Sequence, residues 1–101
     1  MQNLLGWKMR RAVITGMGVV SSLGSDLNVL WDRLKAGKSG IRRITKFDAS
    51  AFDSQIAGEV VDFEPDKFIP KKEQRRMDEF SVFAMAAAKM AMADSGLDVN
   101  A

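Results

Sequence analysis

The sequence predicts an α/β fold. A short β-branched run at residues 11–15 has the profile of a strand that is buried on both faces, as in a parallel sheet. Apolar residues at helical spacing follow it, and a longer, almost wholly apolar helical segment lies towards the carboxyl end. A strand followed by a helix is therefore the expected opening unit of the chain.

The first helix is predicted between Asp26 and Gly37. Ser25 and Asp26 carry side chains that commonly cap the amino terminus of a helix, and Gly37 is the residue type that most often follows its end. The apolar residues between these ends repeat at helical spacing and are Leu27, Leu30, Trp31 and Leu34.

The pattern loosens from residue 38 to residue 70, where glycine, proline, aspartate and serine interrupt short apolar pieces. Residues 56–61 are the best strand candidate there. Pro70 is well placed to begin a helix, because its missing N–H would lack a partner in the first turn anyway. That helix could run unbroken to Ser95, or Asp78 could cap a second helix after a short basic one. We expect the break.

Beyond Phe80 the segment is apolar nearly all the way round, which is typical of a buried helix. Ser95 and Gly96 are expected to end it. The methionines in this region are interpreted as core filler. One stripe is rich in alanine and would let another element approach closely; it consists of Met77, Phe80, Ala84, Ala87, Ala88 and Ala91.

The composition is that of a soluble globular protein with at most one domain, since 47% of the 101 residues are hydrophobic and 28% are charged. A net charge of +2 does not indicate a nucleic-acid role. No apolar run approaches the roughly 20 residues needed to cross a bilayer. The absence of cysteine excludes a disulfide framework and fits a cytoplasmic chain.

Residues 1–8 are expected to be an extension, either a tag or the product of an upstream start codon. They do not have the order of a signal peptide, because Arg10 and Arg11 follow the apolar residues instead of preceding them. Met9 is the expected beginning of the folded part.

Two glycine-containing runs resemble nucleotide-binding motifs without completing them. Residues 16–21 (GMGVVS) have Ser21 where the dinucleotide fingerprint needs its third glycine. Residues 37–39 (GKS) resemble the end of a P-loop, but Asp32 stands at the first glycine position and the triplet closes a helix instead of opening one. We interpret both as structural turns. The acidic residues Asp48, Asp53, Asp62, Glu64 and Asp66 are too scattered to propose a metal site or an acid/base pair.

A cluster of cations precedes the long apolar segment. At roughly 100° per residue the cluster falls within about 140° of arc on a helix; its members are Lys71, Lys72, Arg75 and Arg76. Such a face suits an anionic partner. From charge alone the favoured interpretation is a solvated face, in which Asp78 and Glu79 pair with Arg75.

Residues 71–80 (KKEQRRMDEF) closely resemble the corresponding segment of the type II elongating β-ketoacyl-[acyl-carrier-protein] synthases. Further segments follow in the order and spacing of that family: residues 10–21 (RRAVITGMGVVS), 34–41 (LKAGKSGI), 46–52 (KFDASAF), 56–63 (IAGEVVDF) and 87–97 (AAKMAMADSGL). The resemblance covers nearly everything from Met9 to Asn100.

The resemblance implies the thiolase-like α/β/α/β/α fold, of which residues 9–101 would be an incomplete amino-terminal part of the N-terminal domain. It implies decarboxylative condensation of an acyl chain with malonyl-carrier protein in fatty acid biosynthesis, by a homodimer that needs no external cofactor or metal. The family uses one cysteine and two histidines, and these 101 residues contain neither type. We therefore interpret the chain as a non-catalytic part of the enzyme, from a truncated gene product or a partial sequence record.

The resemblance also implies a partner, acyl carrier protein, which presents an acidic helix. By residue match the docking cations are Lys72, Arg75 and Arg76, with Lys71 a weaker candidate. No nucleic-acid or membrane partner is expected. Two alternatives stay open: a polyketide-type ketosynthase or its chain-length subunit, and a stand-alone carrier-binding module without chemistry.

Overall fold

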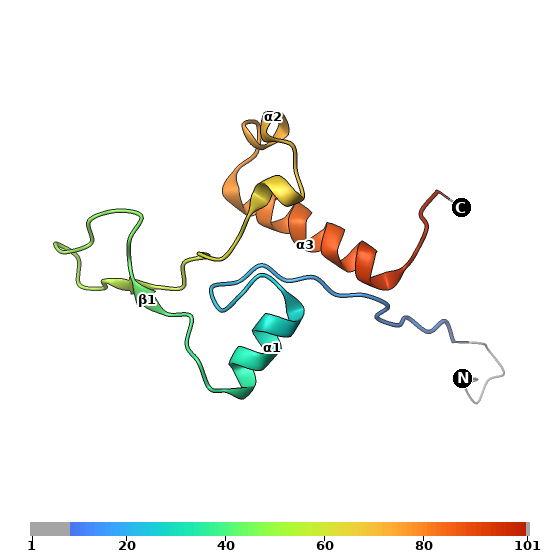
Figure 1. Ribbon diagram of the computed structural model, residues 1–101, viewed down its shortest axis with the longest axis horizontal. Coiled ribbons are helices and arrows are strands. Elements are labelled where there is room, and N and C mark those ends of the chain that lie inside the picture. Colours follow the sequence, from blue (N-terminus) through green and yellow to red (C-terminus); the bar gives the residue numbers. More distant parts are fainter. Residues whose placement is uncertain (1–8, 101) are drawn as a thin grey trace.

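The computed structural model describes residues 9–100 of the chain. Residues 1–8, expected to be an extension or tag, lie outside the described residues. The elements, in chain order, are α1 (Leu27–Lys35), β1 (Arg42–Arg43), β2 (Ile56–Ala57), the 3₁₀ helix η1 (Pro65–Lys67), α2 (Lys71–Gln74) and α3 (Glu79–Ser95). Figure 1 shows α3 lying between α1 and α2, and the chain that precedes α1 running beside it.

Both ends of α1 form as the sequence predicts. The Oδ1 atom of Asp26 accepts hydrogen bonds from the backbone N–H groups of Asn28 at 2.9 Å and Val29 at 3.1 Å. Gly37 has a φ of +70°. Its N–H donates to the carbonyl of Leu34, and the N–H of Lys38 donates to the carbonyl of Arg33. Both hydrogen bonds of a Schellman motif are therefore present. Local capping alone therefore defines this helix.

The predicted break before α3 is confirmed. Pro70 precedes α2 as its cap, and its carbonyl accepts from the N–H groups of Glu73 and Gln74. Asp78 then adopts an extended backbone (φ −71°, ψ 157°), and its carbonyl accepts the first bonds of α3. Gly96, with a φ of +68°, ends α3 at the predicted place.

The prediction of a buried strand at residues 11–15 is wrong. These residues form no strand, and the side chains of Val13 and Ile14 are 77% and 84% exposed. A strand is held by hydrogen bonds to a neighbouring strand, and among residues 9–100 no strand lies beside this run.

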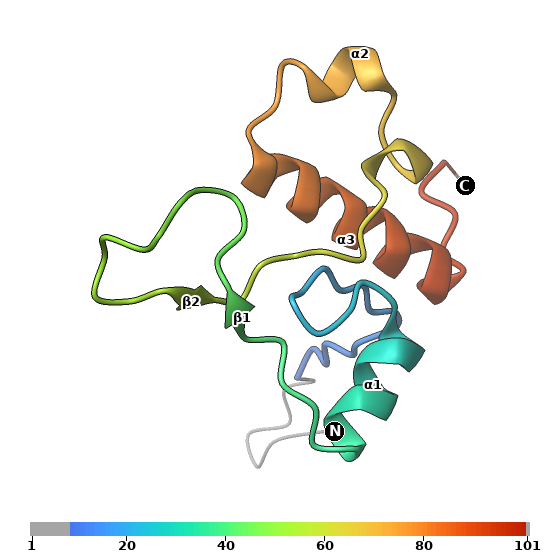
Figure 2. The same ribbon diagram turned by 60° about the vertical axis from the view of Figure 1, so that its left-hand side comes forward.

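The strand predicted at residues 56–61 forms only in part. Ile56 and Ala57 make up β2, which pairs antiparallel with β1 so that Arg42 faces Ala57 and Arg43 faces Ile56. Figure 2 shows this pair at the base of the long loop that joins the two strands. The β1–β2 hairpin is the only sheet in the part of the chain that the structure describes.

Glycines let the chain before α1 pack directly on α3. A Cβ atom added to Gly18 would collide with the carbonyl oxygen of Ala87 and lie 2.7 Å from the Cβ of Met90, while one added to Gly16 would lie 2.6 Å from the backbone N of Ser95. The close approach predicted for the alanine stripe is thus confirmed at Ala87. The run GMGVVS is therefore a close-packed segment, and the structural turn predicted for residues 16–21 is wrong, because these residues form no turn.

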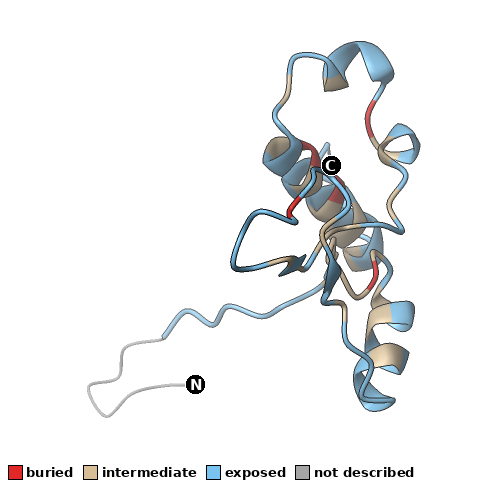
Figure 3. Ribbon diagram, turned by 90° about the vertical axis from the view of Figure 1, so that its left-hand side faces the viewer, coloured by how far each residue is buried: buried red, intermediate tan, exposed pale blue. Residues whose placement is uncertain are grey.

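Burial of α3 on every side is not observed. Val82 and Ala86 are its buried residues, whereas Phe80 is 72% exposed. The described segments cover one side of the helix, and Figure 3 shows how few residues are buried overall. The rest of the buried apolar core is Ala49 and Ile69. The radius of gyration is 18.8 Å, against about 13 Å for a compact domain of 100 residues.

Within residues 9–100, no helix combines the length and the apolar character that crossing a bilayer requires.

We predict that these 101 residues alone are only marginally folded, because so little apolar surface is buried. At micromolar concentration the chain should bind a hydrophobic dye and associate with itself. Dye fluorescence, light scattering and calorimetry measure this. A sharp cooperative thermal transition from a monomer that binds no dye would contradict the prediction.

Candidate functional site

The four cations predicted to share a helical face lie on one short helical turn, residues 71–76, which we call the cationic turn. Lys71 and Lys72 belong to α2, and Arg75 continues its helical geometry with φ −62° and ψ −18°. The N–H of Arg76 donates to the carbonyl of Glu73 at 3.0 Å, which closes the turn. All four cationic residues are exposed. In Figures 1 and 2 the turn stands at one end of the molecule, on the far side of α3 from α1.

Three of these cations are not neutralised by the described residues. Lys71 pairs with Asp66, at 3.6 Å from Nζ to Oδ2. Within residues 9–100, no ion pair involves Lys72, Arg75 or Arg76. Glu73 is the one acid inside the turn, so the turn keeps a positive balance.

The four cations are solvent-exposed, but the expected pairing of Arg75 with Asp78 and Glu79 does not form among the described residues. The break between α2 and α3 removes the regular three- and four-residue spacing on which that expectation rested. Glu79 pairs instead with Lys46, at 2.9 Å from Nζ to Oε1. Arg75 consequently makes no ion pair within residues 9–100.

A second contact holds Lys46 in place. The Glu59 carboxylate accepts hydrogen bonds from the Thr45 hydroxyl at 2.7 Å and the Thr45 backbone N–H at 2.6 Å, and a longer one from the N–H of Lys46 at 3.4 Å. The bond from the Thr45 hydroxyl, followed by that from its N–H, lowers the pKa of Glu59 below its ordinary value of 4.5. The hairpin loop is thereby tied to the first residue of α3.

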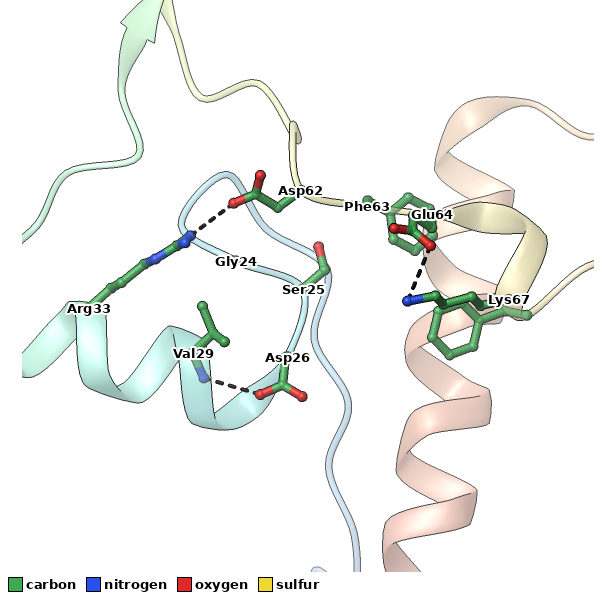
Figure 4. A pocket seen from close by; sticks show the side chains of 10 residues that line it. Gly24, Ser25, Asp26, Val29, Arg33, Asp62, Phe63, Glu64 and Lys67 are labelled. Carbon is green, nitrogen blue, oxygen red and sulfur yellow. Dashed lines mark hydrogen bonds and ion pairs between the residues drawn. The ribbon is translucent and has the colours of Figure 1, made fainter.

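A pocket of about 350 Å³ lies between α1 and η1, and Figure 4 shows its charged groups already engaged. Arg33 pairs with Asp62 at 3.2 Å, and Lys67 pairs with Glu64 at 3.1 Å. Asp26 is occupied by the α1 cap. The Arg33–Asp62 pair joins α1 to the segment before η1, whereas the Lys67–Glu64 pair lies within one short segment.

Four of the five scattered acids make a local hydrogen bond or an ion pair within the described residues. Asp48 accepts from the N–H of Ser50 at 3.0 Å, and the acids near η1 pair with Arg33, Lys67 and Lys71. Across residues 9–100, no group of three or more histidine, cysteine or acidic side chains is placed to hold a metal ion.

Sequence reasoning missed the residues that position the cationic turn. Asp66 contacts Lys71 and Gln74 within the turn, and Lys46 contacts Glu79 just after it. None of Asp66, Gln74 and Lys46 was proposed for a role. The available signal was Gln74, the one uncharged residue within the run KKEQRR.

A comparison with protein-family models decides the relationship of the chain. Residues 9–101 match the model described as "Beta-ketoacyl synthase, N-terminal domain". The chain belongs to the β-ketoacyl synthase family. The resemblance drawn from residues 71–80 and the segments around them is thereby confirmed.

Curated relatives from bacteria and plants are similar to this member of the family. The 3-oxoacyl-[acyl-carrier-protein] synthase 2 of Coxiella burnetii is 53% identical over 91 residues, which are 90% of this chain and 22% of that protein. The chloroplastic 3-oxoacyl-[acyl-carrier-protein] synthase II of Arabidopsis thaliana is 42% identical over 90 residues, which are 89% of this chain and 17% of that protein. The chain thus spans about a fifth of the length of these β-ketoacyl synthases.

Solved ketosynthase structures share the arrangement of the described elements. The ishigamide ketosynthase/chain length factor gives a TM-score of 0.74 at 41% identity, covering 87% of this chain and 22% of that chain. A β-ketoacyl synthase from Burkholderia phymatum gives a TM-score of 0.72 at 36% identity, covering 91% and 23%. The helices and the small sheet of the described residues are consistent with the expected α/β class.

Neither glycine-containing run should bind a nucleotide. The backbone at Gly16 and Gly18 is packed on α3, and the N–H groups of Gly37 and Lys38 are spent on closing α1. Calorimetric titration of the chain with ATP or NADPH should release no binding heat. Dissociation constants in the micromolar range for either nucleotide would contradict this.

The Glu59 contacts should weaken in acid. Because folding lowers the pKa of Glu59, its stabilising effect is complete above 4.5 and is lost as the pH falls through the lowered value. The Thr45 amide signal in the NMR spectrum of ¹⁵N-threonine-labelled protein should therefore titrate with a midpoint below 4.5. In the Glu59→Gln variant this titration should vanish. A midpoint at or above 4.5 would show that the carboxylate is not held as described.

Proposed function

We propose that this chain forms the amino-terminal part of a 3-oxoacyl-[acyl-carrier-protein] synthase with the thiolase-like α/β/α/β/α fold, active as a homodimer in fatty acid elongation. Membership of the β-ketoacyl synthase family supports the proposal, as does the Coxiella burnetii relative, whose name states that activity. Within such an enzyme these residues would serve as scaffold and as a docking surface for acyl carrier protein.

The proposed reaction requires groups that these 101 residues do not contain. A cysteine thiolate would attack the thioester carbon of the acyl-carrier substrate, forming an acyl-enzyme and releasing the carrier thiol. Two histidines would then assist loss of carbon dioxide from malonyl-carrier protein. The resulting carbanion would attack the acyl-enzyme and give the 3-oxoacyl product with return of the thiolate. The chain has no cysteine and no histidine, so it would contribute none of these groups.

One observation carries the docking role. Lys72, Arg75 and Arg76 lie exposed on a single turn and make no ion pair within the described residues. Exposed charges of one sign speed the encounter with an oppositely charged partner and select it, even where they add little affinity. An acidic helix of a carrier protein is a partner of this kind. Lys71 is weaker in this role, because Asp66 already pairs with it.

A second candidate function keeps the fold and changes the pathway. The ishigamide ketosynthase/chain length factor is 41% identical to this chain, so a polyketide-type ketosynthase or its chain-length subunit begins similarly. The residue at the nucleophile position separates these alternatives, because a chain-length subunit is catalytically silent and would not use a cysteine there. Sequencing the DNA downstream of the codon for Ala101 would identify it.

The docking role can be tested in an active chimera, in which this chain replaces the matching 91-residue segment of the Coxiella burnetii synthase. Changing Lys72, Arg75 and Arg76 together to glutamate should slow association with acyl-carrier protein and raise its apparent KM about tenfold or more. The KM for a small pantetheine thioester should hardly change, since that substrate bypasses the surface. Added salt should slow the wild-type association, because exposed charges are screened over about 10 Å at 0.1 M ionic strength.

A matched control makes the same change in charge elsewhere. Lys35, Lys38 and Arg43 are exposed and lie in α1 or between α1 and the end of β1. Their reversal to glutamate should affect carrier kinetics much less than reversal in the cationic turn. Equal effects of the two triple variants would mean that net charge, and not a docking site at the cationic turn, governs carrier-protein association. Wild-type kinetics in the cationic-turn variant would exclude docking at this turn.

A further inference from the structure

The cationic turn is held by a neutral side chain. The Nε2 atom of Gln74 donates a hydrogen bond of 2.8 Å to Oδ1 of Asp66 and one of 2.7 Å to the carbonyl oxygen of Ile69. Both acceptors lie in the segment that leads into the turn, and Ile69 is 1% exposed. The amide therefore ties the last residue of α2 to a buried part of the chain.

Asp66 connects both ends of α2. While Oδ1 accepts from Gln74, the last residue of the helix, Oδ2 lies 3.6 Å from Nζ of Lys71, the first. A single carboxylate thus contacts the two ends of a four-residue helix.

Such an anchor is needed because α2 is too short to be stable alone. Isolated helices shorter than about 12 residues are marginal in water, so tertiary contacts must hold a helix of this length. In Figures 1 and 2 the turn arches away from α3 and does not lie along it. None of the residues of α2 is buried. The side-chain hydrogen bonds of Gln74 thus link the end of α2 to the segment that precedes this helix.

We propose that Gln74 is a positioning residue for carrier recognition: by bonding Asp66 and the Ile69 carbonyl, it fixes the orientation of Lys72, Arg75 and Arg76. This inference rests on the docking function proposed above. It adds that recognition depends on a fixed arrangement of the three cations as well as on their charge. A rigid arrangement spares the ordering of long side chains and of the turn at each binding event.

The test uses the Gln74→Met variant of the active chimera, since methionine has a similar length and no amide. The variant loses both hydrogen bonds of the Gln74 amide, so the apparent KM for acyl-carrier substrate should rise about fivefold or more. The kcat and KM for a pantetheine thioester should stay at the wild-type values, which also shows that the variant folds. Trypsin should cut faster after Lys72, Arg75 and Arg76, because a turn without the Gln74 hydrogen bonds can more easily enter the protease active site. Mass spectrometry follows the cleavage.

Gln55→Met is the matched control. The amide of Gln55 also donates to two backbone carbonyls, those of Ser50 at 3.3 Å and Phe52 at 3.4 Å, but within the hairpin loop. This variant should leave carrier kinetics and cleavage in the cationic turn unchanged.

Each failure points to a different error. Wild-type cleavage in Gln74→Met would overturn the anchoring role itself. Faster cleavage with an unchanged carrier KM would overturn the positioning role, while the triple charge reversal, if still effective, would leave the docking function standing. If the triple reversal were also without effect, the docking function would fail together with this inference.

Discussion

The described structure depends on α3 and on how closely backbone can approach it. The Gly16–Gly18 segment packs on its alanines, where a single Cβ would collide with helix backbone. On the same helix, Lys89 donates to the carbonyl of Phe68 at 2.6 Å, and the Phe83 ring packs edge-on against Phe63 at a centroid distance of 5.5 Å. Small side chains on one stretch and an aromatic on another allow one helix to hold segments that are distant in the chain. The segment from Phe63 to Ile69 then positions the cationic turn.

The parts of the fold that depend on residues close together in the sequence were predicted correctly, and those that depend on distant residues were not. The ends of α1 and α3 depend on residues within a few positions, Asp26, Gly37, Asp78 and Gly96, so the sequence pattern sufficed. The run at residues 11–15 has the composition of a strand, but a strand exists only through its neighbour, and the described residues provide none. The same dependence explains why α3, apolar on nearly all sides, stays partly exposed.

The candidate site shows the same division. The position of the cations on one helical turn follows from their spacing, and it was predicted. Their state of charge pairing does not follow from spacing, because the partner of Glu79 is Lys46, which lies 33 positions away. A loop held by Glu59 brings Lys46 to α3. The local sequence pattern does not predict a contact between residues so far apart in the chain. Neighbouring charges in a sequence are therefore weak evidence of pairing when a helix break lies between them.

The type of side chain that holds α2 also determines how much positive charge the cationic turn keeps. An ion pair can hold a short helix, but each pair consumes a cation, as the contact of Lys71 with Asp66 illustrates. An amide holds the helix without taking any positive charge, and Gln74 does so through two hydrogen bonds. At the other flank, Lys46 pairs with Glu79, an acid four positions after Arg75 in the sequence. With neutral anchoring on one side and Glu79 paired on the other, three cations have no ion pair among residues 9–100, and the proposed docking of an acidic partner would use their charge.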